Sequence, residues 1–464
     1  MIVSAIISRA RRALGISTRS YEAAGAGRRW RNVTEMVSPP AAALASRAAI
    51  MRRARGSYSN QAFARAIIDQ WTASAIATGL KPCSKAPNGE EIDAAFSRWW
   101  DRADFDEATD FGGLQAALFR SMALTGDGLA ALEIDGRGEL RIRLLASEQV
   151  ATVTTPDMAG GHWTVDGIEF GPDLRRAAVH LFKTPPGLPL PSPSLETIRL
   201  PIEDVVHMFR SDHVGVTRGI SWISPVLKRL DDLDGTSDAL VMRARVSAMF
   251  TGFMTDGDGQ MLGPDSPTGD VAMEPGAMVR LRAGEGVEFA SPPQIGAETS
   301  DFLKAIVREC AAGCGVPYEL VSNDLSNANY SSLRGSMMAF RRAVEQVQYG
   351  VVIPQLRKIY RRWLTLEIFA GRIKADGFES NPEAWLAADW LCPKFAPVDP
   401  LKDSQAEILQ IAAGLRSRRE CVAERGRDLE ELDAEIARDR ASADALGLQF
   451  NLSTQATKSA EQTA

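Results

Sequence analysis

The histidines come closest to a catalytic pattern in this chain of 464 residues. Metal-dependent hydrolysis needs His, Asp or Glu side chains that converge on one ion. His207, Asp212 and His213 lie close together in the sequence and are the best candidates for such a site. However, His207 lies in the apolar run VVHMF, where an isolated histidine is more often packed in a strand than bound to a metal. A metal-dependent nuclease or hydrolase is therefore the alternative hypothesis, and a packed histidine is the favoured one.

Carboxylates are clustered at Asp231, Asp232, Asp234 and Asp238. Carboxylates held near each other can bridge divalent ions, as in two-metal nucleases. At helical spacing these four side chains spread over more than one face, so the pattern favours a solvated helix surface.

The five cysteines give no sign of a disulfide framework or a zinc ribbon, because their number is odd and no CxxC pair occurs. This favours a reducing compartment. Cys310 and Cys314 share a helix face without a histidine or a basic cluster nearby. We therefore expect them to be buried apolar thiols.

Nucleotide-binding and acyl-transfer motifs are absent from the sequence. It contains no GxxxxGKS/T, no GxGxxG and no GxSxG. These absences argue strongly against an ATPase, and no cofactor or bound metal is expected. A chain of this size without a credible catalytic constellation suggests a non-enzymatic part of a larger assembly.

Charge is distributed unevenly along the chain. Residues 1–60 carry eleven arginines and only two acids, Glu22 and Glu35, so the remainder is acidic enough to bring the net charge to -6. A basic arm on an acidic body suits nucleic-acid contact, an acidic partner or a solvated terminus. The opening MIVSAII is too short for a secretory signal, and no run of eighteen uncharged apolar residues occurs. We expect no membrane span.

Hydrophobic patterning predicts an α+β protein, and the 45% hydrophobic content allows substantial cores. Apolar spacing predicts helices over 43–78 and 92–125, and again from Ile220. Short alternating runs between 128 and 183, including QVATVTT at 149–155, predict strands, with one more at VVHMF. Five prolines in 184–194 predict an exposed loop. Short strands follow in 251–300, then a helix over 301–314 that stops at Gly315.

The polar stretch NDLSNANYSSLR, residues 323–334, precedes a long helical pattern. Asn and Ser side chains can accept hydrogen bonds from the first amides of that helix, so the stretch is predicted to cap it. Pro354 must kink or end the helix. The apolar positions that follow the polar stretch are spaced four and three apart, as in a narrow heptad-like seam. They are Leu333, Met337, Phe340, Val344, Val347 and Val351.

Five stretches carry a resemblance to a known family, and they span nearly the whole chain. They are RSYEAAGAGRRW at 19–30, FSRWWDRADFDEATDFGGLQAALFRSMALTGDG at 96–128, VVHMFRSDHVGVTRGISWISPVL at 205–227, CGVPYELVSNDLSNANYSSLRGSMMAFRRAVEQVQ at 314–348 and WLCPKFAPVDPLKDSQAEI at 390–408. In this order they resemble the portal proteins of lambda-like tailed phages, the head-tail connectors.

The resemblance implies a closed ring, typically of twelve copies, at one vertex of the capsid in the virion, assembled in the host cytoplasm. Double-stranded DNA would pass through the ring during packaging and ejection. The implied partners are the terminase large subunit, head-completion and tail adaptor proteins, and the major capsid and scaffold proteins. No enzymatic activity is implied.

The family architecture of wing, helical stem, clip and crown is placed on the sequence by analogy. A basic N-terminal arm would take 1–40, the wing 41–295, and the stem and clip 296–370. The tunnel-facing helix and crown would take 371–450, and a disordered tail, containing the polar run QATKSAEQTA, would take 451–464. Helices are predicted near 402–414 and 428–446.

Arg334, Arg341 and Arg342 lie off the apolar seam. They are candidates for salt bridges between neighbouring copies or for contacts with DNA phosphates. The intersubunit role is favoured because arginine suits bidentate pairing with a carboxylate. A third hypothesis makes the basic arm a tail that binds scaffold or capsid protein.

Overall fold

The computed structural model describes residues 38–448 apart from nine short or longer gaps. These gaps are residues 153, 187–195, 250–252, 256–278, 282–296, 327–328, 394–399, 426 and 428. The predicted basic arm at 1–40 lies almost entirely outside the described residues, and the predicted disordered tail at 451–464 lies wholly outside them. Part of the predicted proline-rich loop and most of the predicted 251–300 strand region also fall outside.

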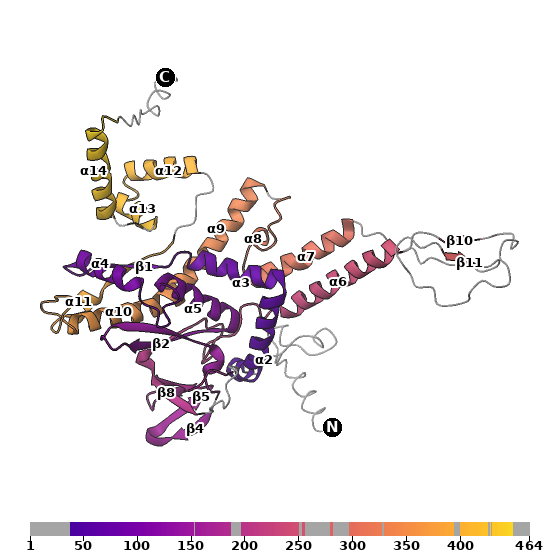
Figure 1. Ribbon diagram of the computed structural model, residues 1–464, viewed down its shortest axis with the longest axis horizontal. Helices are drawn as coiled ribbons and strands as arrows, with labels where there is room; N and C mark the ends of the chain where they lie inside the picture. Colours follow the sequence, from indigo (N-terminus) through magenta and orange to yellow (C-terminus); the bar gives the residue numbers. More distant parts are fainter. Residues whose placement is uncertain are drawn as a thin grey trace, which may run out of the picture.

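The body of the protein mixes helices and sheets, as the sequence predicts (Figure 1). Its first half alternates helices with short strands. The elements are α2 Pro39–Asn60, α3 Ala62–Ala75, β1 Lys81–Ser84, α4 Gly89–Trp100, α5 Phe111–Thr125, β2 Asp127–Ile134 and β3 Leu140–Leu145. The predicted helix over 43–78 is therefore two helices, and the predicted helix over 92–125 is also two.

The strands from β2 to β9 form two antiparallel sheets. The first has three strands in the order β3-β2-β9, with β9 spanning Val205–Phe209 and β2 in the middle. The second is a five-stranded meander in the order β4-β5-β6-β7-β8. Its strands are β4 Thr155–Met158, β5 His162–Val165, β6 Ile168–Phe170, β7 Arg176–Phe182 and β8 Thr197–Pro201.

One strand prediction is wrong. Residues 149–155 were expected to form a strand, but Ser147–Gln149 form a 3-10 turn and β4 begins only at Thr155. Val150 makes a single isolated bridge to Leu181. Val150 and Ala151 are buried although they form no continuous strand ladder. The apolar pattern there therefore reflects burial rather than strand pairing.

Aromatic side chains fill the centre of the main core. Phe96 lies with its ring centroid 4.9 Å from that of Trp363 and 5.9 Å from that of Phe111. Trp363 belongs to α10 (Ile353–Phe369) and is 1% exposed, so residues more than 250 positions apart in the sequence form one cluster. A second, smaller core under the meander contains Leu129, Val179 and Leu181.

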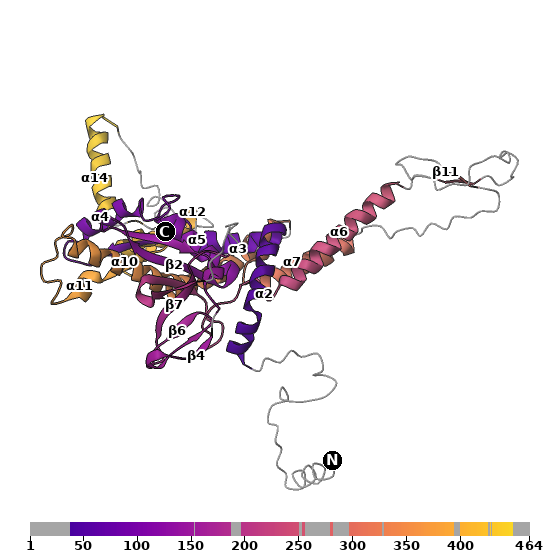
Figure 2. The same ribbon diagram turned by 60° about the horizontal axis from the view of Figure 1, so that its bottom comes forward.

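Two long helices lie side by side as an antiparallel pair (Figure 1), and Figure 2 shows that the pair projects away from the body. They are α6 (Leu227–Met249) and α7 (Ala297–Gly313), and the short parallel pair β10 (Phe253–Thr255) and β11 (Val279–Leu281) lies beyond them. The predicted helix start at Ile220 is wrong, because residues 222–226 form turns and α6 begins only at Leu227.

Apolar side chains along this pair are buried only near the body. Leu230 and Cys310 are buried, whereas Val241 is 48% and Phe302 57% exposed. Val241 lies three helical turns beyond Leu230 on the same apolar stripe, and Phe302 lies two turns before Cys310. Those faces have no covering element among the described residues of this chain.

The capping prediction at the polar stretch is confirmed. Helix α9 spans Tyr330–Val347, and Asn329 caps it: Asn329 Oδ1 accepts from the Ser332 amide at 2.8 Å, and Ser332 Oγ accepts from the Asn329 amide. Pro354 does end the regular pattern, since a π-helical turn at Gln348–Val352 separates α9 from α10, which carries Pro354 in its first turn. Helix α8, Tyr318–Ser322, precedes the polar stretch.

The C-terminal part forms a small group of helices beside the body (Figure 1). The elements after α10 are α11 Pro382–Leu386, β12 Ala388–Leu391, α12 Pro400–Ala412, α13 Arg418–Glu424 and α14 Leu429–Ala445. The helices near 402–414 and 428–446 are confirmed. The sequence did not indicate α13 or the pairing of β1 with β12.

Candidate functional site

A buried ion network holds the first sheet, the meander and α2 together. Its centre is Asp127 at the start of β2, which is fully buried. The Asp127 carboxylate accepts from Arg218 Nε at 2.9 Å, from the Gly219 amide at 3.1 Å and from His207 Nε2 at 3.0 Å. Together these bonds hold the pKa of Asp127 far below its usual range, the Arg218 guanidinium being the largest favourable influence against the opposing effect of burial.

Arg47 and Asp166 extend this network. Arg47 Nε donates to Asp166 Oδ2 at 2.7 Å, and the Arg47 guanidinium also donates to the carbonyl oxygens of Gly219 and Arg218. Arg218 NH1 lies 3.4 Å from Asp166 Oδ1. Two arginines and two aspartates, all nearly fully buried, therefore bind α2, β2, the β5–β6 turn and the loop after β9 to one another.

The end of α5 and the loop after β9 approach each other closely at this network, and two glycines allow this approach. Gly126 has φ +100 and ends α5, and a Cβ built on it would lie 2.5 Å from the Gly219 carbonyl. A Cβ on Gly219 would lie 2.1 Å from the Gly126 carbonyl oxygen. These positions accept only glycine, because no larger residue leaves room for Arg218 and Asp127 to meet.

His207 is a structural member of this network. Its Nε2 faces Asp127 and its Nδ1 lies 3.1 Å from Arg176 NH1. Because the guanidinium can only donate, Nδ1 must accept and Nε2 must carry the proton. Burial lowers the pKa of His207, which is consistent with this neutral tautomer.

The alternative hypothesis of a metal site at His207, Asp212 and His213 has no support in the described residues. Both ring nitrogens of His207 already have partners inside the sheet. Asp212 and His213 lie exposed in the loop after β9, where Asp212 Oδ1 accepts from Arg210 Nε at 2.7 Å. The packed-histidine interpretation of VVHMF is the one that the structure confirms.

The carboxylate cluster on α6 forms no metal site either. Asp231, Asp232, Asp234 and Asp238 are exposed on α6, as predicted for a solvated surface. Within the part of the chain that the structure describes, no group of three or more His, Cys, Asp or Glu side chains is placed to hold a metal ion.

A second charged cluster lies on the meander. Glu169 is 3% exposed and accepts from Arg199 Nε and NH2 at 2.8 and 2.9 Å. His162 Nδ1 and His180 Nε2 each lie 2.8 Å from one of its oxygens. The Arg199 bonds come first among the causes that lower the pKa of Glu169 to about 2. Because Arg199 occupies both carboxylate oxygens, the cluster joins four strands rather than presenting a free ligand set.

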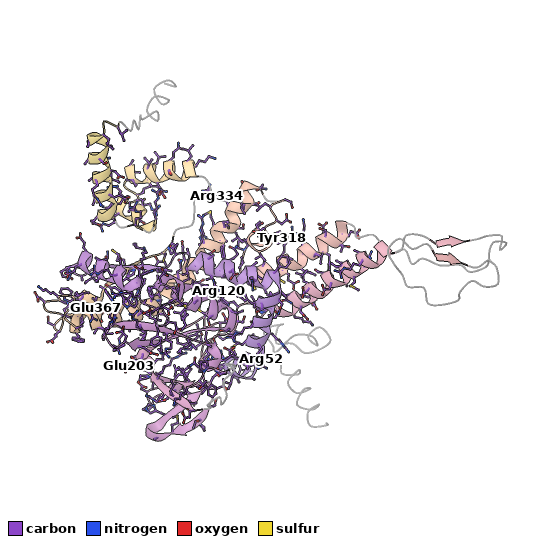
Figure 3. All side chains as sticks on the ribbon, viewed as in Figure 1. Arg52, Arg120, Glu203, Tyr318, Arg334 and Glu367 are labelled. Carbon is purple, nitrogen blue, oxygen red and sulfur yellow. The ribbon has the colours of Figure 1, made fainter. Side chains whose placement is uncertain are left out.

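The three candidate arginines all lie on α9. Arg334 and Arg342 are exposed and Arg341 is half-buried, while Phe340, Val344 and Val347 face the core as the seam predicts. Figure 3 places Arg334 on the outer half of α9, away from the sheets. The structure does not bring Arg334 together with Arg341 and Arg342 at one site, since it lies two helical turns from them.

The loop at residues 210–225, between β9 and α6, has a hollow on each side. The larger, of about 680 Å³, is lined by Trp71, Trp222, Cys314 and residues of α9 and the π-helical turn. The smaller, of about 390 Å³, lies against α2. Arg210, Asp212, Ser224 and Pro225 line both, and we call the two hollows together the 210–225 groove. No motif in the sequence indicated this groove.

Among the helices that the structure describes, none is both long and apolar enough to cross a membrane.

A family model for the phage portal protein, lambda family, matches residues 26–348. The chain belongs to this portal family. The matched region runs from before α2 to the first residue of the π-helical turn, so it contains the ion network, both sheets, the α6–α7 pair and α9.

Curated relatives carry the same description. The probable portal protein of Halomonas phage phiHAP-1 is 22% identical over 365 residues, which cover 75% of this chain and 69% of the relative. The portal protein of Escherichia phage N15 is 26% identical and portal protein B of Escherichia phage lambda 25% identical, each over 272 residues. For these two, the alignment covers 52% of this chain and 51% of the relative, so the chain spans about half of their length.

Solved structures with a similar course of the chain come from gene transfer agent particles. A chain from the neck of the native particle, determined with C12 symmetry, is 16% identical with a TM-score of 0.45, covering 81% of this chain and 91% of that one. A chain from the native virion is 16% identical with a TM-score of 0.46, covering 82% and 93%.

Proposed function

We propose that copies of this chain form a closed ring at one capsid vertex and serve as the conduit for double-stranded DNA during packaging and ejection. The observation that carries the proposal is the portal-family match over residues 26–348, which is most of the chain. The structural use of His207 agrees with a non-enzymatic role, since Asp127 and Arg176 occupy both of its ring nitrogens.

The family architecture fits the structure best with a changed boundary. We propose the α6–α7 pair as the stem, because it projects from the body as two long antiparallel helices (Figure 2). The segment between them would then be the clip, and the body with both sheets the wing. This moves the start of the stem from residue 296 to Leu227 and leaves α9 and α10 in the body, where they pack with α3 and β9. Helices α12 to α14 would form the crown.

Exposed apolar side chains on the proposed stem and crown support assembly into a ring. Val241, Met242 and Phe302 on the stem are each about half exposed. In the crown, Leu401, Ile408 and Leu409 are all more than 60% exposed. Exposed apolar surface on this scale is typical of surfaces that a partner covers. A head-to-tail ring would cover them with neighbouring copies.

The acidic balance of the chain suits a channel through which DNA slides. Duplex DNA carries about one negative charge per 1.7 Å of axis, so a uniformly basic lining would hold it through counterion release. Mostly acidic or neutral walls with few cations would let it pass regardless of sequence. Arg334, Arg341 and Arg342 on α9 are proposed as contacts between neighbouring copies, with DNA phosphate as the alternative partner.

The partners proposed for the ring are those of its family: the terminase large subunit during packaging, head-completion and tail adaptor proteins afterwards, and capsid and scaffold proteins during assembly in the host cytoplasm. The basic arm before α2 is proposed to contact scaffold or capsid. Deletion of residues 1–38 tests this role, since it should leave ring formation intact and reduce incorporation into shells.

Native mass spectrometry and light scattering of the purified full chain test the proposal. A single closed oligomer, expected near twelve copies, supports it. Monomers or dimers at every concentration and salt tested would refute it. Incubation with plasmid DNA and Mg²⁺ or Mn²⁺ is the accompanying test of the non-enzymatic role, for which intact plasmid is expected.

A further inference from the structure

Helix α12 buries very little of its surface against the rest of the chain. It has 13 residues, and among those whose side chains the structure describes, only Glu407 is half-buried while the others are exposed. Glu407 Oε2 accepts from NH2 of Arg425, just after α13, at 2.5 Å. A helix shorter than about 12–15 residues is only marginally stable by itself, because most helix stability in proteins comes from packing of an apolar face. We therefore expect α12 to pack against a surface outside the described residues of its own chain.

One side of α12 is apolar and exposed. Leu401, Ile408 and Leu409 are 68%, 66% and 68% exposed, and Ile411 is 37% exposed. At 3.6 residues per turn, Leu409 lies about 100° to one side of Ile408 and Ile411 about 60° to the other. Leu401 lies between them, so the apolar arc spans about 160°. The seam that serves one partner helix is narrower, so this arc has room for a helix on each side.

A closed ring supplies two such helices to every copy. Rotation about the ring axis places α12 of each copy at the same height and radius, between the α12 helices of the preceding and the following copy. The Leu409 side of one helix would meet the Ile411 side of the next, as a head-to-tail contact requires. Helices pack 8–10 Å apart, so a closed band of twelve would surround a bore of roughly 25 Å, which leaves room for duplex DNA.

We propose that α12 packs side by side with α12 of both neighbouring copies, so that the crown contains a closed band of helices. The inference rests on the proposed ring and names one contact within it. Helix α12 lies beyond residues 26–348, so the family match does not itself supply this contact. Every copy in a ring has such a neighbour, whereas any other partner would have to cover the apolar arc in all copies at once.

Cysteine pairs test which sides of the helices meet. Leu409→Cys combined with Ile411→Cys places two thiols on opposite sides of α12, where they cannot bond to each other but face the neighbouring copies. Oxidation of assembled rings with copper phenanthroline, followed by a denaturing gel without reductant, should give a ladder of covalent oligomers up to the full ring. The wild type and both single variants are the controls and should give no ladder, because the native cysteines are buried or half-buried.

Rings of the double variant that give no ladder would overturn the proposal. Covalent dimers of either single variant would also overturn it, because the same sides of two helices would then meet. A wild type that forms no ring would instead refute the proposed function.

Amide exchange tests what covers the apolar arc. The α12 amides should exchange fast in the unassembled subunit and slowly in the ring. Slow exchange in the unassembled subunit would overturn the proposal, because the chain's own residues would then cover the arc. Fast exchange in assembled rings would overturn it as well, because the arc would then await a different partner.

A charge placed in the arc tests its contribution to assembly. Ile408→Asp should raise the concentration for half-assembly at least tenfold, the scale expected when one isoleucine is no longer buried, and should leave the melting temperature of the unassembled subunit unchanged. Val214→Asp is the matched control, since Val214 is 99% exposed in the loop after β9, and its assembly should match the wild type. Equal assembly of Ile408→Asp and the wild type would overturn the proposal.

Discussion

Replacing Asp127 with asparagine removes the charge at the centre of the ion network. The carboxylate is fully buried and accepts from Arg218, His207 and the Gly219 amide. Asparagine keeps the shape and one acceptor oxygen but removes the charge. Its amide nitrogen would then point a donor either at the Arg218 guanidinium or at His207 Nε2 and the Gly219 amide.

The expected cost follows from the burial of both partners. Arg218 is 1% exposed, and in the variant its only remaining carboxylate partner in the described residues is Asp166 at 3.4 Å. Removing one partner of a buried ion pair costs about 3–5 kcal/mol. Asp127→Asn should therefore lower the free energy of unfolding by that amount.

Urea unfolding of the unassembled subunit, followed by tryptophan fluorescence, measures the effect. Asp173→Asn is the matched control, because Asp173 is an exposed carboxylate with a surface arginine 3.7 Å away. Its change should stay within about 0.5 kcal/mol. In a double-mutant cycle with Arg218→Met, the two losses should fall short of additive by about 0.5–3 kcal/mol. A loss below about 1 kcal/mol for Asp127→Asn, or full additivity, would refute the central role of this carboxylate.

Three further outcomes are expected from the charged groups and the α9 cap. Burial lowers the pKa of His207 below its ordinary 6.5, so the contribution of the neutral ring to stability is present above pH 6.5 and is lost as the pH falls. The urea midpoint should therefore fall as the pH is lowered from 8 to 5. His207→Gln should make the midpoint less dependent on pH. The pKa of Glu169 is lowered to about 2, chiefly by Arg199, so Arg199→Ala should raise that pKa in a titration followed by NMR, and an unchanged value would contradict the assignment. Asn329→Ala should cost about 1 kcal/mol and speed amide exchange in the first turn of α9, whereas Asn329→Ser should restore both; equal exchange in all three proteins would contradict the capping role.

Elements with strong local signals could be predicted from the sequence. The seam from Leu333 to Val351 identified the buried face of α9, and the polar stretch before it identified the cap at Asn329. Gly315, with φ +69, ends α7 as the Gly and Pro spacing indicated. In each case the interactions that decide the structure join residues within one or two helical turns of each other. The spacing of the residues along the sequence is therefore enough to predict them.

The ion network could not be predicted, because its members are distant in the sequence. Five separate segments contribute its members, which are Arg47, Asp127, Asp166, His207 and Arg218. In the sequence, each of them taken alone suggests a surface charge or a histidine within a strand. The one sequence signal for the network was His207 inside an apolar strand, because a buried histidine needs hydrogen-bond partners that are also buried. The sequence placed Asp212 and His213 close to His207, whereas the true partner, Asp127, lies on the neighbouring strand of the sheet.

The exposure of the far half of α6 could not be predicted for a related reason. The apolar stripe of α6 runs through Val241, but a periodic apolar face does not reveal whether the same chain covers it. In a subunit that buries such a face against another copy, the sequence pattern is that of a core helix while the isolated chain leaves the face exposed.

The most direct test of the proposed conduit is an electron cryomicroscopy image of the purified full-length chain viewed along its symmetry axis. The account predicts a closed ring with the α6–α7 pairs arranged around an open bore wide enough for duplex DNA. Single subunits, an open filament or a ring with a filled centre would contradict it.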